Sequence, residues 1–235
     1  MNKRYGVVGR HPWNRKHFEQ CLHGTPGEWH FAGTPEELQR IEDDADSYRY
    51  LFFLHWSDKV PSDLLQRVEC VCFHMTDVPF GRGGSPLQNL IVGGFRETKL
   101  TALRMTPELD GGPVYLKVPL SLEGGTAEEI YQRVSRLSCE LALRIAAGEP
   151  LPERQQGAPV VFRRRRPEDS AIPDGGASLE NLFDHIRMLD AEGYPAAFID
   201  HGPFRLTFRR AACYHGRVQA DVSITLRSEP TTADE

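Results

Sequence analysis

Cys70, Cys72 and His74 lie two residues apart along the segment CVCFH (70–74). If this segment is a strand, side chains two residues apart point to one face, so the two thiols and the imidazole share a face. His74 then stands where the strand ends and a glycine-rich loop begins, and ligands bind at the carboxyl ends of strands in parallel α/β sheets. The histidine therefore marks a candidate site, although a hydrogen-bonded structural role would place it there equally well.

A metal site is the alternative that these residue types suggest. Structural zinc sites usually draw four ligands from two paired clusters. The C-x-C-x-H spacing has no second cluster elsewhere in the chain. We therefore expect no metal here.

The loop PFGRGGSP (79–86) follows the strand, and Arg82 is its only charge. Its three glycines allow a positive φ or a close backbone approach. The loop is either a flexible connector or a binding loop that leads into a helix N-terminus and suits an anion or phosphate. It lacks the G-x-x-x-x-G-K-S/T pattern, which excludes a P-loop nucleotide hydrolase.

A third segment, MTPELDGGP (105–113), joins two predicted strands and places Asp110 at a turn. Aspartate before two glycines is a common turn former, so this feature alone leaves a structural and a functional role open.

The composition limits the class of protein. A chain of 235 residues fits one domain, or one domain with a small appendage. The net charge of −5 gives no support for wholesale nucleic-acid binding. The first residues lack the apolar core of a signal peptide, and no segment approaches 18 apolar residues. With an odd count of five cysteines and no framework spacing, we expect a reduced, cytoplasmic protein that does not enter a membrane.

Strand and helix signals alternate along the first two thirds of the chain. Strands are predicted at 5–8, 50–55, 70–75, 98–105 and 114–120, and helices at 14–23, from Thr34 onward, at 62–68, at 86–92 and at 127–147. This alternation predicts an α/β fold, a Rossmann-like and mostly parallel sheet with flanking helices and right-handed crossovers.

The pattern changes at GEPLPERQQGAP (148–159), which has the composition of a connector. One further helix with Ser178 as its cap is followed by strand signals at 196–200, 204–209 and 218–226. We expect an α/β domain over 1–155 and a small, β-rich C-terminal subdomain over 156–235.

Four segments in this order resemble the folate-dependent formyltransferases. That family includes methionyl-tRNA formyltransferase, glycinamide ribonucleotide transformylase and the N-formyltransferases of nucleotide-linked amino sugars. In that family an Asn-x-His motif ends a strand, and CFH (72–74) is similar to it. A Pro- and Gly-rich loop that closes in P-x-Q follows, and PFGRGGSPLQ (79–88) is similar to this loop. The family's E-T-G-x-T and L-D-x-G motifs resemble ETKLT (97–101) and LDGG (109–112). The segments FRRRRPEDSAI (162–172) and EGYPAAF (192–198) resemble the sugar-acting members, those of surface-glycan and pseudaminic-acid-type biosynthesis.

The resemblance implies acyl transfer, in which a substrate amine attacks the formyl carbon of N10-formyltetrahydrofolate. His74 would stabilise the intermediate or relay its proton, and Asp110 would orient the imidazole. The family's asparagine, an oxyanion-hole donor, falls on Cys72, whose thiol is a weak donor. Cys72 with a backbone N–H or water, or the amide of Gln88 or Asn89, would then replace it.

The resemblance also assigns binding residues. It places the folate against Leu54, His55 and Trp56 and against the turn residues Pro107, Glu108 and Leu109. It places the acceptor near the loop residues Arg82, Gly83, Ser85 and Gln88. The resemblance implies a small-molecule amino sugar as the partner and no nucleic-acid partner. Whether the protein forms a homodimer is left open.

Other functions compete with this one. A catalytically silent folate- or nucleotide-sugar-binding homologue would explain Cys72. Initiator methionyl-tRNA formylation and purine-pathway formyl transfer are the remaining family activities; the first is disfavoured by the acidic chain and the short tail. The run Arg163–Arg166 is either a solvated surface or a contact for phosphates.

Overall fold

The structure is a computed structural model that describes residues 2–175 and 178–227. These residues form two compact units. The first comprises residues 2–86, 96–123 and 130–163, and the second comprises residues 87–95, 124–129 and the described part of 164–227. The domain boundary expected after residue 155 stays a proposal.

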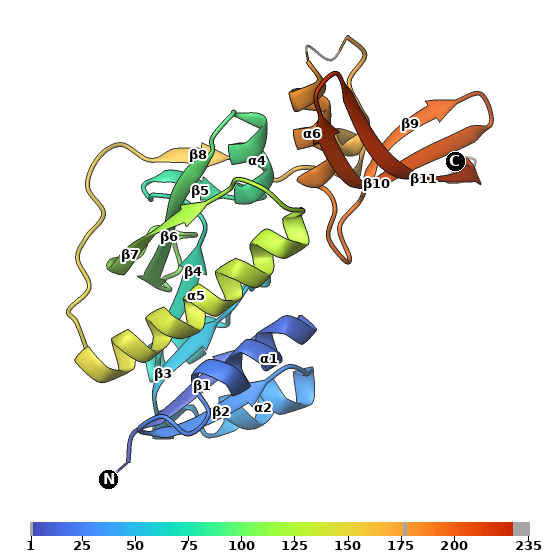
Figure 1. Ribbon diagram of the computed structural model, residues 1–235. Coiled ribbons are helices and arrows are strands. Elements are labelled where there is room, and N and C mark those ends of the chain that lie inside the picture. The colour runs from blue at the N-terminus through green and yellow to red at the C-terminus, as the bar shows by residue number, and fades with distance from the viewer. Residues whose placement is uncertain (1, 176–177, 228–235) are drawn as a thin grey trace, which may run out of the picture. The chain divides into compact units, whose positions relative to one another are not determined.

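A six-stranded sheet in the order β2-β1-β3-β4-β6-β7 forms the centre of the first unit (Figure 1). The strands β2, β1, β3 and β4 run parallel to one another, whereas β6 is antiparallel to both β4 and β7. The strand bounds are Arg4–Val8 (β1), Glu28–Ala32 (β2), Tyr48–Phe53 (β3), Glu69–His74 (β4), Glu97–Arg104 (β6) and Val114–Ser121 (β7). The prediction of a mostly parallel α/β sheet is confirmed.

Helices lie between or after these strands along the chain. Their bounds are Pro12–Cys21 (α1), Pro35–Asp43 (α2), Ser62–Arg67 (α3), Pro86–Val92 (α4) and Ala127–Gly148 (α5), and Ala45–Ser47 is a short 3-10 turn. The start of α2 is as predicted: Pro35 is its first residue, and the Glu37 backbone N–H donates to Thr34 Oγ1 at 3.2 Å. A cap of this kind stabilises a helix by about 1 kcal/mol.

The apolar run of β3 lies at the centre of the core. Leu51, Phe52 and Phe53 are at most 1% exposed, as expected for a strand covered on both faces. Burying each such side chain contributes about 2 kcal/mol. Cys70 on β4 belongs to the same buried cluster as Leu51 and Phe53, and Cys72 packs against it.

A two-stranded parallel sheet joins β5 (Phe80–Gly83) to β8 (Val160–Phe162). Neither strand was predicted, because β5 lies in the glycine-rich loop and β8 directly follows the connector. Gly83 has a φ of +98°, and a Cβ there would lie 2.6 Å from the Phe162 carbonyl oxygen. Only glycine allows β5 to approach β8 this closely.

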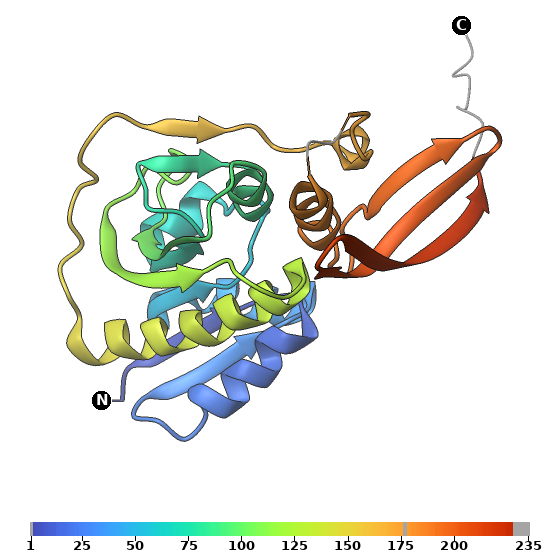
Figure 2. The same cartoon turned by 45° about the horizontal axis from the view of Figure 1, so that its top comes forward.

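The second unit contains an antiparallel sheet in the order β11-β10-β9 (Figure 2). Its elements are a 3-10 turn at Pro167–Ser170, α6 (Leu179–Arg187), β9 (Ala197–His201), β10 (Phe204–Tyr214) and β11 (Arg217–Leu226). The prediction of a β-rich C-terminal part is confirmed. The strand β10 extends past the predicted end at residue 209, because a bulge between Arg209 and Ala212 carries the pairing onward.

No helix within residues 2–175 or 178–227 is long and apolar enough to cross a bilayer.

Candidate active site

His74 is the last residue of β4, and its side chain is 9% exposed. Its Nε2 atom lies 2.7 Å from the Gly81 carbonyl oxygen, which can only accept a hydrogen bond. Its Nδ1 atom lies 3.6 Å from Oδ1 of Asp110. Nε2 is thus engaged with the backbone of the glycine-rich loop, and Nδ1 is on the side of the ring that faces the Asp110 carboxylate.

Asp110 lies in the turn between β6 and β7. Its φ is +52°, a left-handed conformation that aspartate adopts more readily than most residues. Oδ2 of Asp110 accepts a hydrogen bond of 2.9 Å from the Gly83 backbone N–H, so the turn is tied to the glycine-rich loop. Two residues on, a Cβ at Gly112 would lie 1.8 Å from the Arg104 carbonyl oxygen, which only glycine tolerates.

Cys72 lies one strand period before His74, in register with Phe53 on β3 and Leu103 on β6. Burial raises the pKa of its thiol far above the ordinary range. The side chain is therefore a neutral thiol, a weak hydrogen-bond donor and a poor nucleophile at neutral pH.

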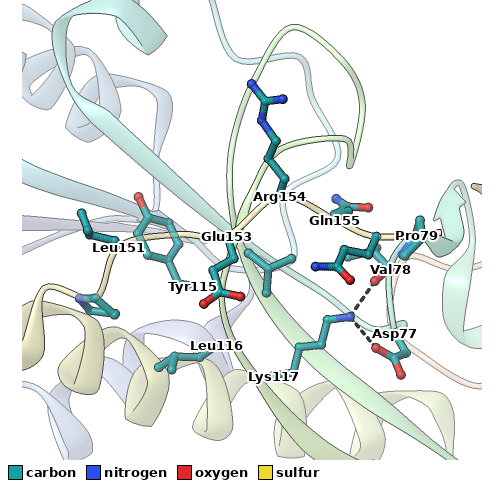
Figure 3. Close-up of a pocket in the computed structure, with 13 residues that line it drawn as sticks. Asp77, Val78, Pro79, Tyr115, Leu116, Lys117, Leu151, Glu153, Arg154 and Gln155 are labelled. Atoms are coloured by element: carbon teal, nitrogen blue, oxygen red, sulfur yellow. Dashed lines mark hydrogen bonds and ion pairs between the residues drawn. The ribbon is translucent and has the colours of Figure 1, made fainter.

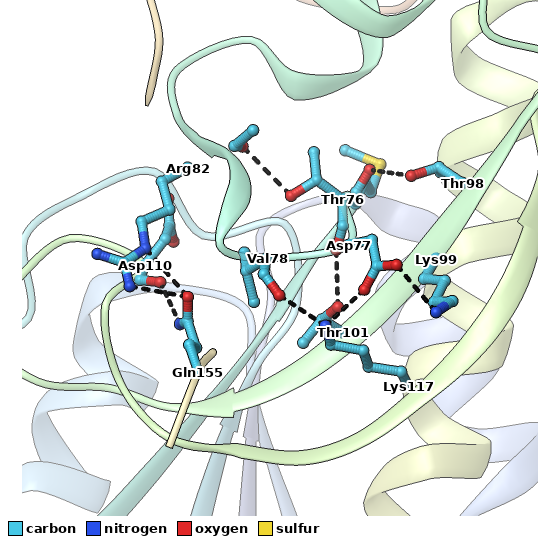
Figure 4. A network of polar contacts seen from close by, with 12 residues as sticks. Thr76, Asp77, Val78, Arg82, Thr98, Lys99, Thr101, Asp110, Lys117 and Gln155 are labelled. Carbon is cyan, nitrogen blue, oxygen red and sulfur yellow. Dashed lines mark hydrogen bonds and ion pairs between the residues drawn. The ribbon is translucent and has the colours of Figure 1, made fainter. Parts of the chain in front are cut away.

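Arg82 links two groups of predicted binding residues. Its Nη1 donates to Oε1 of Glu108 at 2.6 Å, and its Nε and Nη2 donate to Oε1 of Gln155 at 3.0 and 2.8 Å. Figure 4 shows Arg82, Asp110 and Gln155 together. A residue predicted to bind acceptor is thus paired with one predicted to contact folate.

The segment Leu54–Trp56 follows β3, and two of its side chains have unused polar atoms. Nδ1 of His55 lies 3.3 Å from the Asn14 amide nitrogen, whereas its Nε2 is buried with no hydrogen-bond partner among the described residues. The same holds for Nε1 of Trp56. Burial lowers the pKa of His55 to about 3, so the ring is neutral. Buried polar atoms without protein partners are suited to a ligand or water.

The other predicted binding residues differ in their surroundings. Leu109 is 72% exposed on the same turn as Asp110, and Pro107 and Glu108 precede it. Ser85 has a φ of +50° at the end of the glycine-rich loop. Gln88 belongs to the second unit, where its buried amide donates to the Met188 carbonyl oxygen at 3.0 Å. These placements leave the binding roles as predictions.

A polar network lies beneath the loop that follows β4. Lys117 on β7 donates to the Asp77 carboxylate and to the Val78 carbonyl oxygen, and Lys99 on β6 also pairs with Asp77 (Figure 4). The Thr101 hydroxyl donates to the Thr76 carbonyl oxygen at 2.7 Å. These contacts fix the loop that leads from His74 to the glycines.

A cavity of about 680 Å³ lies beside this network, between β7 and residues 150–156 (Figure 3). His74 and Asp110 do not line it. A second cavity, of about 200 Å³, is lined by Arg10 and Trp56, and the Arg10 guanidinium lies 4.3 Å from the Trp56 ring centroid. Volume alone therefore does not identify the candidate site, which rests on the contacts around His74.

Within the part of the chain that the structure describes, no three His, Cys, Asp or Glu side chains are arranged to hold a metal ion. Sequence reasoning missed Gln155, Asp77 and Lys117, which all contact candidate residues or the loop that carries them. No motif marks them, and Gln155 lies in a segment whose composition indicated only a connector.

The family model and the curated relatives that match this chain name the same enzyme. Residues 167–225 match the family model described as "Methionyl-tRNA formyltransferase, C-terminal domain". A methionyl-tRNA formyltransferase of Sinorhizobium medicae is 31% identical over 150 residues, which cover 60% of this chain and 47% of that protein. The chain thus spans about half the length of the curated relatives it matches.

Solved structures match over more of their length. A structure described as methionyl-tRNA formyltransferase from Clostridium thermocellum is 38% identical with a TM-score of 0.89, over 96% of this chain and 100% of that one. A 4-N formyltransferase from Francisella tularensis has a TM-score of 0.67 at 14% identity, over 97% of this chain and 99% of that one. At that identity the second structure shows the fold alone.

Proposed function

This chain belongs to the formyltransferase family that includes methionyl-tRNA formyltransferase, and we propose that it transfers a formyl group from N10-formyltetrahydrofolate to a primary amine. One observation carries the proposal. His74 and Asp110, which the sequence resemblance matches to the family's histidine and aspartate, have side-chain atoms 3.6 Å apart at the carboxyl end of β4. A nearly buried imidazole beside a carboxylate is suited to proton transfer.

The residues proposed to hold the folate fit a polar, ring-shaped ligand. Buried Nε2 of His55 and Nε1 of Trp56 have no hydrogen-bond partner among the described residues, and a heterocycle with donors and acceptors could satisfy them. The turn Pro107–Leu109 adds main-chain groups and the exposed Leu109 side chain. When bound, N10-formyltetrahydrofolate would supply the formyl group, and tetrahydrofolate would leave as the bond between N10 and the formyl carbon breaks.

The chain's own residues would perform three tasks. The left-handed turn at Asp110 holds its carboxylate toward His74, and His74 takes up or passes on the proton that the attacking amine loses. Binding both reactants near β4 would supply proximity. Cys72 offers only a neutral thiol where charge develops, so a backbone N–H or water must contribute most of the oxyanion stabilisation.

We propose that the acceptor is the amine of a nucleotide-linked amino sugar. The segments 162–172 and 192–198 resemble those enzymes. Arginines of the second unit are also paired internally: Arg205 with Asp200 at 2.8 Å, and Arg209 with Asp190 at 3.1 Å. Binding to nucleic acid requires basic groups that can reach phosphates, and paired arginines supply fewer of them.

A second candidate acceptor is initiator methionyl-tRNA. The match of residues 167–225 to the C-terminal domain of methionyl-tRNA formyltransferase favours it, as does the Clostridium thermocellum structure. In this case exposed residues of the run Arg163–Arg166 would contact phosphates.

The test measures consumption of N10-formyltetrahydrofolate with two sets of acceptors, nucleotide-linked 4-amino sugars and charged initiator tRNA. Turnover with an amino sugar supports the first proposal, and turnover only with the tRNA supports the second. Folate binding without turnover on either set would support a silent homologue and would contradict formyl transfer to both acceptors.

A further inference from the structure

We infer that Gln155 is a positioning residue of the candidate active site, whose side-chain amide holds the Asp110 turn in place and thereby directs the Asp110 carboxylate at His74. The inference rests on the proposed function for its catalytic consequence. Its structural part can be measured without turnover.

The Gln155 amide uses its full hydrogen-bonding capacity within this site. Nε2 donates to the carbonyl oxygens of Asp110, at 2.7 Å, and Gly112, at 2.8 Å. Oε1 accepts from Nε and Nη2 of Arg82 at 3.0 and 2.8 Å. An amide has two N–H donors and two acceptor lone pairs, so all four are engaged. This pattern also fixes the orientation of the amide.

The carbonyls that Gln155 binds belong to a turn whose backbone has an unfavourable conformation at Asp110. Asp110 has a φ of +52°, and a non-glycine residue in this region persists only when its surroundings hold it there. Two hydrogen bonds from one side chain clamp the turn on both sides of Gly111. Gln155 is therefore placed to maintain the conformation from which the Asp110 side chain projects.

The Asp110 side chain completes the link to the reacting groups. Its Oδ2 accepts from the Gly83 N–H at 2.9 Å, and its Oδ1 lies 3.6 Å from Nδ1 of His74. On the other side, Arg82 joins Gln155 to Glu108. A shift of the turn would thus move the carboxylate away from the imidazole. Gln155 itself contacts neither His74 nor any proposed reacting atom, so its role is indirect.

The chain offers a matched pair of variants. Gln155→Met keeps the length of the side chain but removes all four hydrogen bonds, whereas Gln156→Met makes the same change at an exposed neighbour. A second variant, Gln155→Glu, keeps acceptors for Arg82 and loses both donors to the turn. Gln155→Glu takes the place of Gln155→Met in the test if Gln155→Met does not fold.

Hydrogen exchange of the Gly83 amide, followed by NMR on the full chain, reports on the Asp110 carboxylate directly. We expect this amide to exchange about tenfold faster or more in Gln155→Met and in Asp110→Ala, which removes the acceptor, with no change in Gln156→Met. Unchanged Gly83 exchange in both folded Gln155 variants would overturn the inference. This result stands even if the wild-type protein formylates no amine, in which case only the proposed function fails.

With an acceptor that turns over, kcat should fall by about 10- to 100-fold in Gln155→Met, because misplacing a catalytic group by about 1 Å has effects of this size. The KM for the acceptor should change little. The double variant Gln155→Met/Asp110→Asn should be no slower than Asp110→Asn alone, since both changes remove the same interaction. If the two single-variant losses in kcat multiply in the double variant, Gln155 does not act through Asp110, and the inference is contradicted.

Discussion

Nδ1 of His74 and Oδ1 of Asp110 face each other at 3.6 Å, just beyond hydrogen-bond distance, while both side chains are nearly buried. Catalytic contacts in ligand-free proteins are often longer than those in the reacting complex. A movement of a few tenths of an ångström would bring the carboxylate into hydrogen-bond contact with the ring. Binding of the two substrates can therefore shorten the distance between the His74 ring and the Asp110 carboxylate.

Replacing His74 by alanine should lower kcat by about 10²- to 10⁴-fold, because the group that handles the proton is lost. The fold should survive, since the side chain forms one hydrogen bond at the end of a strand. Circular dichroism and steady-state rates check both points, with His23→Ala, at an exposed position, as the control. Full turnover in His74→Ala would refute its role.

Replacing Asp110 by asparagine should lower kcat by about tenfold to a thousandfold with little change in melting temperature. Asparagine tolerates the left-handed backbone, and its Oδ1 can still accept from the Gly83 N–H. What it lacks is the negative charge facing His74. A loss of stability as large as the loss of activity would indicate a structural role instead.

Replacing Cys72 by asparagine should preserve or raise the rate, because an amide is a stronger hydrogen-bond donor than a thiol. Burial raises the pKa of Cys72, and that of Cys70 to about 12, so neither forms a reactive thiolate at neutral pH. In the native protein a thiol reagent should modify the exposed Cys213 first. Complete loss of activity in Cys72→Asn, or rapid labelling of Cys72, would assign the thiol a different role.

The free energy of unfolding should fall as the pH decreases from about 6.5 toward 3, in part through His55. Burial lowers the pKa of His55 to about 3, whereas the unfolded chain takes up a proton near the ordinary value of about 6.5. Between these values the unfolded state binds more protons, so stability rises with pH and this contribution is complete above about 6.5.

Urea unfolding of the wild type and of His55→Gln at pH 4.5 to 6.5 tests this expectation. The variant should show a shallower dependence on pH, and His23→Gln, at an exposed position, should match the wild type. Equal slopes for all three proteins would mean that His55 is protonated in the folded state.

Glu149 follows the last residue of α5 with a φ of +41°. Because a left-handed conformation costs a residue with a Cβ about 1–2 kcal/mol, Glu149→Gly should be more stable than Glu149→Ala by about 1 kcal/mol. At exposed Arg144, within α5, the order should reverse, since glycine is worse than alanine there by about 1 kcal/mol. The same order at both positions in urea unfolding would rule out strain at Glu149.

The sequence predicted most elements whose patterns are local. The capped start of α2 and the periodic apolar positions of α5 are properties of neighbouring residues, and both helices form as expected. The strand β2 was not predicted, because it lies at the edge of the sheet and its residues EWHFA are mostly half-exposed, without a clear apolar alternation. The pairing of β5 with β8 joins segments far apart in the chain, and no local pattern encodes such pairing.

The residues of the candidate site likewise fall into those that sequence motifs indicated and those that no motif indicated. Motif order along the chain led to His74 and Asp110, and the structure brings these two together with Gly83. The course of residues 150–156 past the Asp110 turn depends on the folded sheet, so no pattern could indicate Gln155. The catalytic and binding roles themselves stay predictions until variants are measured.

The second unit is assembled from three stretches of chain, because residues 87–95 and 124–129 belong to it together with the C-terminal part. Within it, Gln88 donates to the Met188 carbonyl oxygen, and the Glu128 backbone N–H donates to that of Asp190. A chimera made by exchanging the chain after residue 163 with that of a relative would bring in a foreign helix α6 without its native partners. Grafting the second unit of a relative would therefore need three segments rather than a single crossover.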